Sequence, residues 1–146
     1  MAFGIGIYYW QNGVNIGTLW RSALCFGASF LFVIGKPYEL QSSDNLKAGR
    51  HLPLVCYPDW ESFQVSRPMG WPLVAVEQAP EATLLQDFHH PRSAIYLLGS
   101  EGTGLPGRVL AQSQSVVQMG SRFCLNVATA GSIVMWHRSV QGRKID

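Results

Sequence analysis

A glycine-rich turn with one carboxylate occupies residues 99–106, Gly99-Ser100-Glu101-Gly102-Thr103-Gly104-Leu105-Pro106. The apolar run Ala94–Leu98 before it is typical of a buried β-strand, and Pro106 stands where a helix can begin. Glycine accepts positive φ and carries no Cβ, so such a loop can bring backbone N–H and C=O groups close to a ligand. The same pattern also fits an ordinary tight turn, so the loop alone identifies no ligand.

A second chemically interesting side chain is Arg21, on a predicted helix. Between Asn15 and Phe26 the apolar residues recur at i, i+3, i+4, i+7 and i+8, which predicts an amphipathic helix. Asn15 is the expected N-cap of this helix and Gly27 its expected end. Arg21 then lies on the arc opposite the apolar face. A solvated surface arginine is the competing interpretation.

The elements that must position these residues form an α/β pattern. Apolar runs predict strands at residues 3–9, 30–34, 54–57, 73–76, 94–98 and 115–119. A short helix is expected at 59–65 with Asp59 as its cap, a helical turn near 82–86, and a frayed tail over 141–146. A final helix over 125–140 is apolar nearly all round, so we expect it to be buried on more than one side. The prediction is one domain, residues 1–146, with a mainly parallel six-stranded sheet flanked by helices.

Composition limits the function classes. Of the 146 residues 47% are hydrophobic and 14% charged, as in a folded domain, and the net charge of +2 indicates no broadly basic nucleic-acid binder. A polyanion site would therefore have to be local or shared between subunits. The cysteines (Cys25, Cys56 and Cys124) and the four histidines lack metal-ligand or disulfide spacing. Neither a signal peptide nor a membrane-crossing run is visible, so we expect a soluble, metal-free cytoplasmic protein.

Three patches, read together, resemble the SpoU/TrmH branch of the SPOUT RNA methyltransferases. The first is Asn15-x-Gly17-x-x-x-Arg21, similar to the family's N-x-G-x-x-x-R motif. The second is Gly99-Ser100-Glu101-Gly102-x-Gly104-Leu105, and the third is Met119 followed by Cys124-Leu125-Asn126-Val127-Ala128. Their order and separations also match, so the resemblance covers essentially the whole chain.

The resemblance implies a C-terminal trefoil knot that binds S-adenosylmethionine, and a homodimer formed through the last helix. The chain is similar to the minimal members of the family, so we expect no separate RNA-binding domain. The residues implied to hold the cofactor lie at strand ends and in the glycine-rich loop: Glu77, Gly99, Gly102, Val117, Met119 and Leu125.

The implied chemistry is transfer of the sulfonium methyl group to a ribose 2′-hydroxyl. Arg21 matches the family arginine that activates this hydroxyl; a guanidinium, with a pKa above ~12, is a poor base, so we favour stabilisation of the developing alkoxide. Asn15, Glu101 and Asn126 are implied to order the loop and the interface, and the last two could instead be pure scaffolding. Cys124 stands where the family usually has Ser, and a thiol is a weaker hydrogen-bond donor. A nucleophilic Cys124 is disfavoured because no partner base lies nearby in sequence.

The sequence thus predicts an S-adenosylmethionine-dependent RNA ribose 2′-O-methyltransferase acting on tRNA rather than rRNA. The alternative is a catalytically silent RNA-binding or assembly factor, suggested by Cys124 and the modest charge; a base-methylating enzyme fits the motifs less well. The groups expected to hold RNA are basic: Arg21, the loop 36–51, Arg108, Arg122, Arg138, Arg143 and Lys144.

Overall fold

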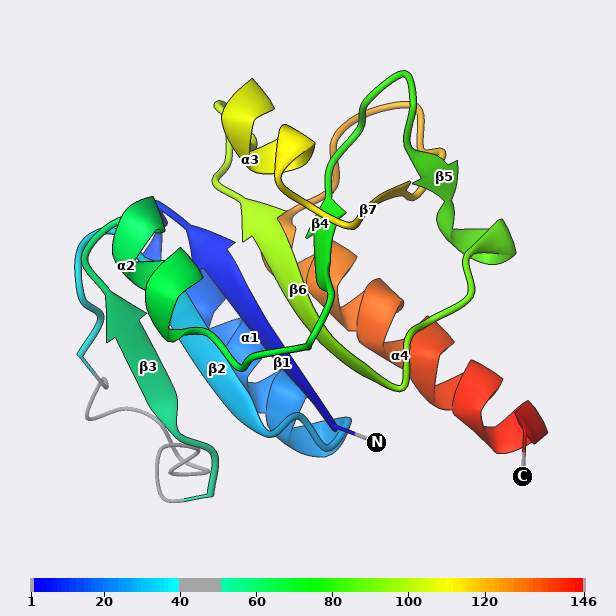
Figure 1. Cartoon of the computed structure of the whole chain (residues 1–146), viewed down its shortest axis with the longest axis horizontal. Coiled ribbons are helices and arrows are strands. Elements are labelled where there is room, and N and C mark those ends of the chain that lie inside the picture. Colours follow the sequence, from blue (N-terminus) through cyan, green and yellow to red (C-terminus); the bar gives the residue numbers. More distant parts are fainter. Residues whose placement is uncertain (1, 40–50, 146) are drawn as a thin grey trace.

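The computed structural model describes residues 2–39 and 51–145, and its centre is one parallel β-sheet (Figure 1). The described residues form seven strands in the order β3-β2-β1-β6-β4-β7-β5, and every neighbouring pair is parallel. Their bounds are β1 Ala2–Tyr8, β2 Phe30–Ile34, β3 Leu54–Tyr57, β4 Leu73–Val76, β5 Thr83–Leu84, β6 Ser93–Gly99 and β7 Ser115–Gln118. The α/β class is confirmed. The predicted six strands were one too few, because the two-residue β5 is too short to give a periodic signal.

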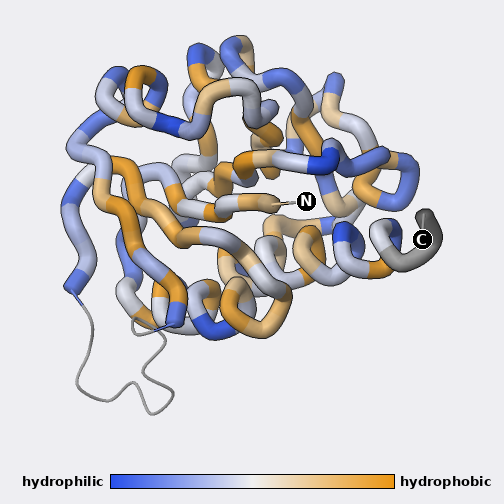
Figure 2. Tube along the Cα trace, turned by 60° about the horizontal axis from the view of Figure 1, so that its bottom comes forward, coloured by the Kyte–Doolittle hydropathy of each residue, from blue (hydrophilic) through white to orange (hydrophobic). Residues whose placement is uncertain are grey.

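Helices cover both faces of the sheet (Figure 1). The helices are α1 Gly13–Cys25, α2 Trp60–Ser66, α3 Gly107–Ala111 and α4 Val127–Ile145, with a 3₁₀ turn at Leu85–Asp87. Two apolar cores result, one between the sheet and α1 with α4, and one between the sheet and α2 with α3. Hydrophobic residues concentrate along the strands, as Figure 2 shows, which is expected of a parallel sheet covered on both faces.

The N-terminus of α1 differs from the prediction. The N-cap is Asn12, whose side-chain oxygen accepts a hydrogen bond from the backbone N–H of Val14 at 3.0 Å. Asn15 lies inside the first turn and is buried. Asparagine is a favoured cap at both positions. The Asn15 side chain instead accepts a hydrogen bond from Asn126, so Asn12 is the cap. The predicted end is confirmed, because Gly27 follows the helix with a φ of +78°.

The C-terminal helix also departs from the expected bounds. It begins at Val127 rather than residue 125 and continues to Ile145, so residues 141–145 are helical rather than frayed. The Gln141 side chain ties this end to the chain before β6: its oxygen accepts from the N–H of His90 at 2.8 Å and its amide donates to the carbonyl of Phe88 at 2.7 Å. The helical turn is shifted as well, to Leu85–Asp87.

Pro106 is the residue before α3 rather than its first helical residue. None of the helices in the described part of the chain is long and apolar enough to cross a bilayer.

Candidate functional site

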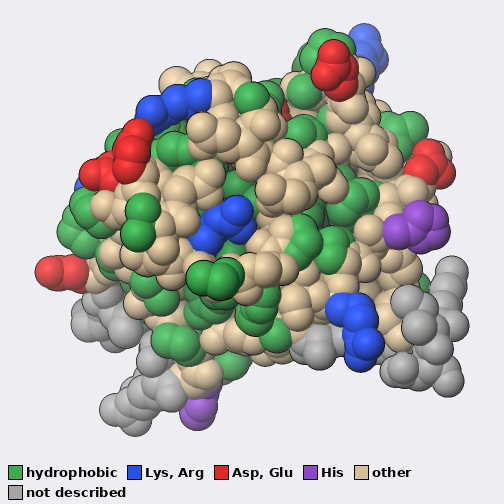
Figure 3. Space-filling view, in the orientation of Figure 1, with side chains coloured by type: hydrophobic (Ala, Val, Ile, Leu, Met, Phe, Trp, Pro, Cys, Tyr) green, Lys and Arg blue, Asp and Glu red, His purple; other side chains and the backbone are tan. Residues whose placement is uncertain are grey.

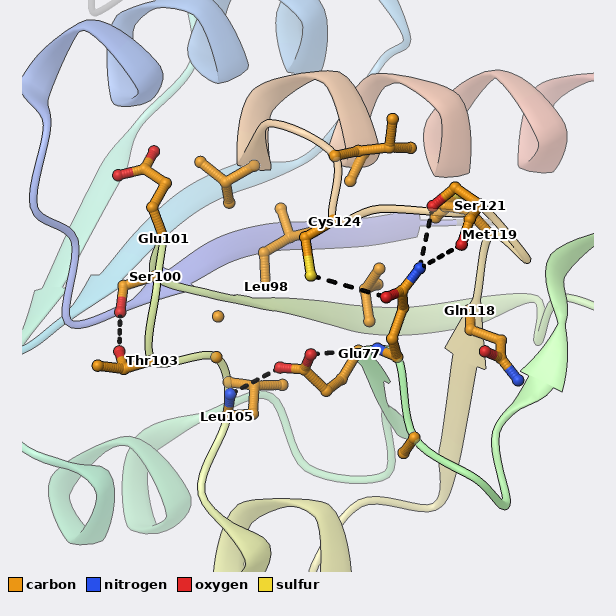
Figure 4. Close-up of a pocket in the computed structure, with 18 of the residues that line it drawn as sticks. Glu77, Leu98, Ser100, Glu101, Thr103, Leu105, Gln118, Met119, Ser121 and Cys124 are labelled. Carbon is orange, nitrogen blue, oxygen red and sulfur yellow. Dashed lines mark hydrogen bonds between the residues drawn. The ribbon is translucent and has the colours of Figure 1, made fainter.

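The main cavity opens at the carboxyl ends of β4, β6 and β7, the edge where parallel sheets commonly bind ligands (Figure 4). It has a volume of about 600 Å³. Its walls are the residues after β4, the glycine-rich loop after β6, the segment 118–125 and the start of α4. Two of the three motif segments therefore meet at one cavity.

Glu77 joins the first two walls of this cavity. It follows β4 directly, and its Oε2 accepts a hydrogen bond from the backbone N–H of Leu105 at 2.7 Å. Gly104 has a φ of +65°, and a Cβ there would lie 2.4 Å from Glu77 Oε2. Only glycine lets the loop close onto this carboxylate.

Gln78 joins the third wall to β4. Its side-chain amide donates to the carbonyl and the hydroxyl of Ser121, at 2.9 and 3.0 Å. Its oxygen accepts a hydrogen bond from the Cys124 thiol at 3.6 Å. Gln78 was not predicted from the sequence. Its position just after a buried strand was the only signal, since its partners lie more than 40 positions away.

Asn15 and Asn126 form a direct link between α1 and α4. The Asn126 side-chain amide donates to the Asn15 oxygen at 2.9 Å. The Asn126 oxygen in turn accepts from the backbone N–H groups of Ala128 and Thr129, at 2.9 and 3.1 Å, and so caps α4. The structure thus brings together one residue of the first motif and one of the third. Neither side chain lines the main cavity.

Glu101 lies on the rim of the main cavity, and its carboxylate points away from Glu77 and Cys124 (Figure 4). It also lines a small cavity that Asn12 and Asn15 share. Its Oε1 is buried and has no hydrogen-bond partner in the described structure. The loop around it is held by a 2.6 Å hydrogen bond between the hydroxyls of Ser100 and Thr103.

The other predicted cofactor residues divide into two groups. Gly99, Gly102, Met119 and Leu125 line the main cavity together with Glu77. Val117 does not, because its side chain is fully buried and its carbonyl accepts the N–H of Glu77 at 3.0 Å.

Arg21 lies outside the cavity. It is exposed on α1, and its guanidinium makes no hydrogen bond or ion pair with any residue that the structure describes. Cys124 is exposed at the cavity wall. The described residues contain no group of three His, Cys, Asp or Glu side chains that could hold a metal ion.

The predicted RNA-binding cations form no single patch, and Figure 3 shows the Lys and Arg side chains of one face as separate groups. Arg108 is exposed and pairs with Glu61 at 3.1 Å. Arg138 instead points inward and donates to the carbonyls of Pro91 and Arg92. Residues 40–50 of the predicted RNA-facing loop and the side chains of Arg143 and Lys144 lie outside what the structure describes.

Most of the chain matches the model of a known protein family. Residues 3–136 match the SpoU rRNA methylase family. The chain belongs to this family. It is 28% identical over 137 residues to a tRNA (guanosine(18)-2′-O)-methyltransferase of Mus musculus, covering 87% of the chain and 9% of that relative. The chain thus spans about a tenth of the length of the curated relatives it matches.

Solved structures share the fold. One, described as giving structural insights into the 2-OH methylation of C/U34 on tRNA, has a TM-score of 0.83 at 23% identity and covers 98% of this chain and 97% of its own. Another is the SpoU methyltransferase AviRb of Streptomyces viridochromogenes in complex with AdoMet, with a TM-score of 0.81 at 22% identity, covering 97% of this chain and 58% of its own. These TM-scores establish the common fold.

Proposed function

We propose that this protein is an S-adenosylmethionine-dependent RNA ribose 2′-O-methyltransferase with tRNA as its substrate. The observation that carries the proposal is the cavity at the carboxyl ends of β4, β6 and β7, walled by the second and third family motifs. The family match and the tRNA methyltransferases among the relatives support the same reaction.

The cavity suits S-adenosylmethionine by size and chemistry. Its volume of about 600 Å³ lies within the usual range for small-molecule sites. Leu98, Met119 and Leu125 supply apolar surface for a purine ring. Backbone groups in the glycine-rich loop and the segment 118–125 would bind its polar edge. When bound, the cofactor supplies an electrophilic methyl group, and the protein must position the ribose hydroxyl against it.

Arg21 is the group proposed to act on that hydroxyl, by stabilising the alkoxide as it forms. A phosphate of the RNA would take the proton, because the arginine itself stays protonated. Since Arg21 does not line the cavity of its own chain, we propose a homodimer in which Arg21 completes the partner's site. The exposed apolar residues Ile133 and Trp136 on α4, 37% and 55% exposed, support an interface through that helix.

The first experiment is a calorimetric titration with S-adenosylmethionine and S-adenosylhomocysteine, followed by methyl transfer to unmodified tRNA. We expect about one site per chain. Arg21→Ala should lower transfer by about 100-fold or more, the loss of one transition-state charge contact, and leave cofactor affinity unchanged. Arg92→Ala is the matched control. Arg92 is exposed and directly precedes the amino end of β6, whereas the cavity lies at the carboxyl end of that strand. If cofactor binding fell as much as methyl transfer in Arg21→Ala, the role of Arg21 would be structural.

The competing function is a catalytically silent RNA-binding factor. The weak contact between the Cys124 thiol and Gln78, at 3.6 Å, favours it. Absence of cofactor binding by folded protein that still binds tRNA would decide for this alternative. We also propose a reducing, cytoplasmic location, which the three free, exposed cysteines support.

A further inference from the structure

Tyr9 has an unusual backbone conformation. Its φ of +48° is the one positive value at a non-glycine residue in the part of the chain that the structure describes. A bulky side chain rarely adopts this region, and such outliers persist where the surroundings hold them. Here the N–H of Tyr9 donates to the carbonyl of Ile34 at 2.7 Å and fixes the turn that follows β1.

This conformation presents the Tyr9 ring at the surface. The side chain is 43% exposed, and its ring lies edge-on to that of Tyr8, with centroids 4.6 Å apart. On another side lies Gly35, where a Cβ would come within 2.8 Å of the ring. Two neighbours therefore hold the ring while leaving a large part of it open to solvent.

Two exposed cations lie beside neighbours of this ring. Arg108 interacts with Tyr8, whose ring contacts that of Tyr9, and pairs with Glu61 at 3.1 Å. Lys36 follows Gly35 directly, and its ammonium lies 4.0 Å from the centroid of the Trp10 ring. An exposed aromatic ring with exposed cations on adjoining residues has the chemistry that binds single-stranded nucleic acid, because bases stack on rings and phosphates pair with cations.

The position of Tyr9 relates it to the main cavity. Tyr8 pairs with Gly99 in the sheet, so Tyr9 leaves β1 at the edge where the glycine-rich loop begins (Figure 1). We propose that Tyr9 stacks on a base of the RNA substrate next to the ribose that is methylated, and is a positioning residue for that RNA. The proposal rests on the proposed function.

The test compares Tyr9→Phe, which keeps the ring, with Tyr9→Gly, which removes it and relieves the positive φ. The probe is unmodified tRNA, used in methyl transfer and in equilibrium binding. Loss of one stacked base should raise the KM and the Kd for tRNA about 5- to 100-fold in Tyr9→Gly. Tyr9→Phe should stay within about two-fold of wild type, since the π-face is retained. Affinity for S-adenosylmethionine should not change in either variant.

The matched control is Met69→Ala, because Met69 is 97% exposed and lies in the connection between α2 and β4. Unchanged tRNA affinity in Tyr9→Gly would overturn the stacking role, and so would a wild type that binds no tRNA. A parallel loss of cofactor affinity or of melting temperature would overturn it as well, by making Tyr9 structural. A wild type that binds tRNA without methylating it would contradict the proposed function instead, and the binding comparison would still test Tyr9.

Discussion

A chain of hydrogen bonds holds His90 in place. Arg138 can only donate, so the Tyr96 hydroxyl accepts from it at 3.0 Å, and the same hydroxyl shares a hydrogen bond with His90 Nδ1 at 2.7 Å. His90 Nε2 shares a further hydrogen bond with His137 Nδ1 at 2.8 Å. Burial is the main cause that lowers the pKa of His90 from 6.5 to about 3, and the charges of His137 and Arg138 contribute.

The lowered pKa of His90 predicts that the free energy of unfolding decreases at acid pH. The pKa of His90 is lower in the folded than in the unfolded state, so its contribution to stability is complete above pH 6.5 and decreases as the pH falls toward about 3. The slope should stay below the one-proton limit of about 1.4 kcal/mol per pH unit, because the cluster is partly exposed. Urea unfolding at pH 7 and pH 5 should therefore show a smaller loss for His90→Gln than for wild type. His89→Gln, at the exposed neighbour, is the control and should follow wild type. Equal losses for all three proteins would contradict the prediction.

At the scale of elements, the most specific prediction concerns Gly104 in the glycine-rich loop. Gly104→Ala places a Cβ 2.4 Å from Glu77 Oε2 at a φ of +65°, so it should break the bond to Leu105 and cost about 1–3 kcal/mol of stability. S-adenosylmethionine affinity should fall with it, by about ten-fold or more. Gly107→Ala is the control: no atom lies within 4 Å of its Cβ, and Gly107 opens α3, so stability should stay equal or rise by about 0.5–1 kcal/mol. Similar thermal melts and titrations for both variants would refute the role of Gly104.

The elements with a strong local signal could be predicted from sequence. The apolar spacing of α1 gave its buried face, with Ile16, Leu19, Trp20 and Ala23 buried as expected. Asp59 caps α2 as predicted, accepting from Ser62 at 2.7 Å. Boundaries were less certain where two residues satisfy the same rule, as Asn12 and Asn15 do. The end of α4 was wrong because its anchor, Gln141, bonds to residues about 50 positions away.

In the candidate site, too, features with a local sequence signal could be predicted, and contacts between distant residues could not. The glycine-rich loop and Glu77 could be placed from motif and strand end, and they do meet. Gln78 and the bond between Asn15 and Asn126 could not be derived from local pattern, since each contact depends on the order of strands in the sheet. The trefoil knot, which depends on how the chain threads rather than on pairing, stays a prediction.

At the scale of the whole molecule, the position of Arg21 raises the question of subunit cooperation. The cavity is walled by the second and third motifs, and Arg21 of the first motif is exposed outside it. Its neighbour in that motif, Asn15, is held at the contact between α1 and α4. The proposed interface through Ile133 and Trp136 belongs to the same α4, so a second copy seated there would lie against the helix pair that carries Arg21.

Co-expression of two impaired variants separates a shared site from a self-contained one. Arg21→Ala retains the cavity and Gly104→Ala retains the arginine, so at a limiting S-adenosylmethionine concentration, where the weakened Gly104→Ala cavity stays largely empty, each homodimer should have little activity. Random pairing makes about half of the dimers mixed, and each mixed dimer has one intact site of two if Arg21 acts across the interface. Methyl transfer should then recover to about a quarter of wild type. If Arg21 served its own chain, every site would lack either the arginine or the cavity and no activity would return. Recovery must also disappear in Trp136→Glu versions of both variants, because a charge at an apolar contact opposes pairing, which ties the restored activity to the dimer itself.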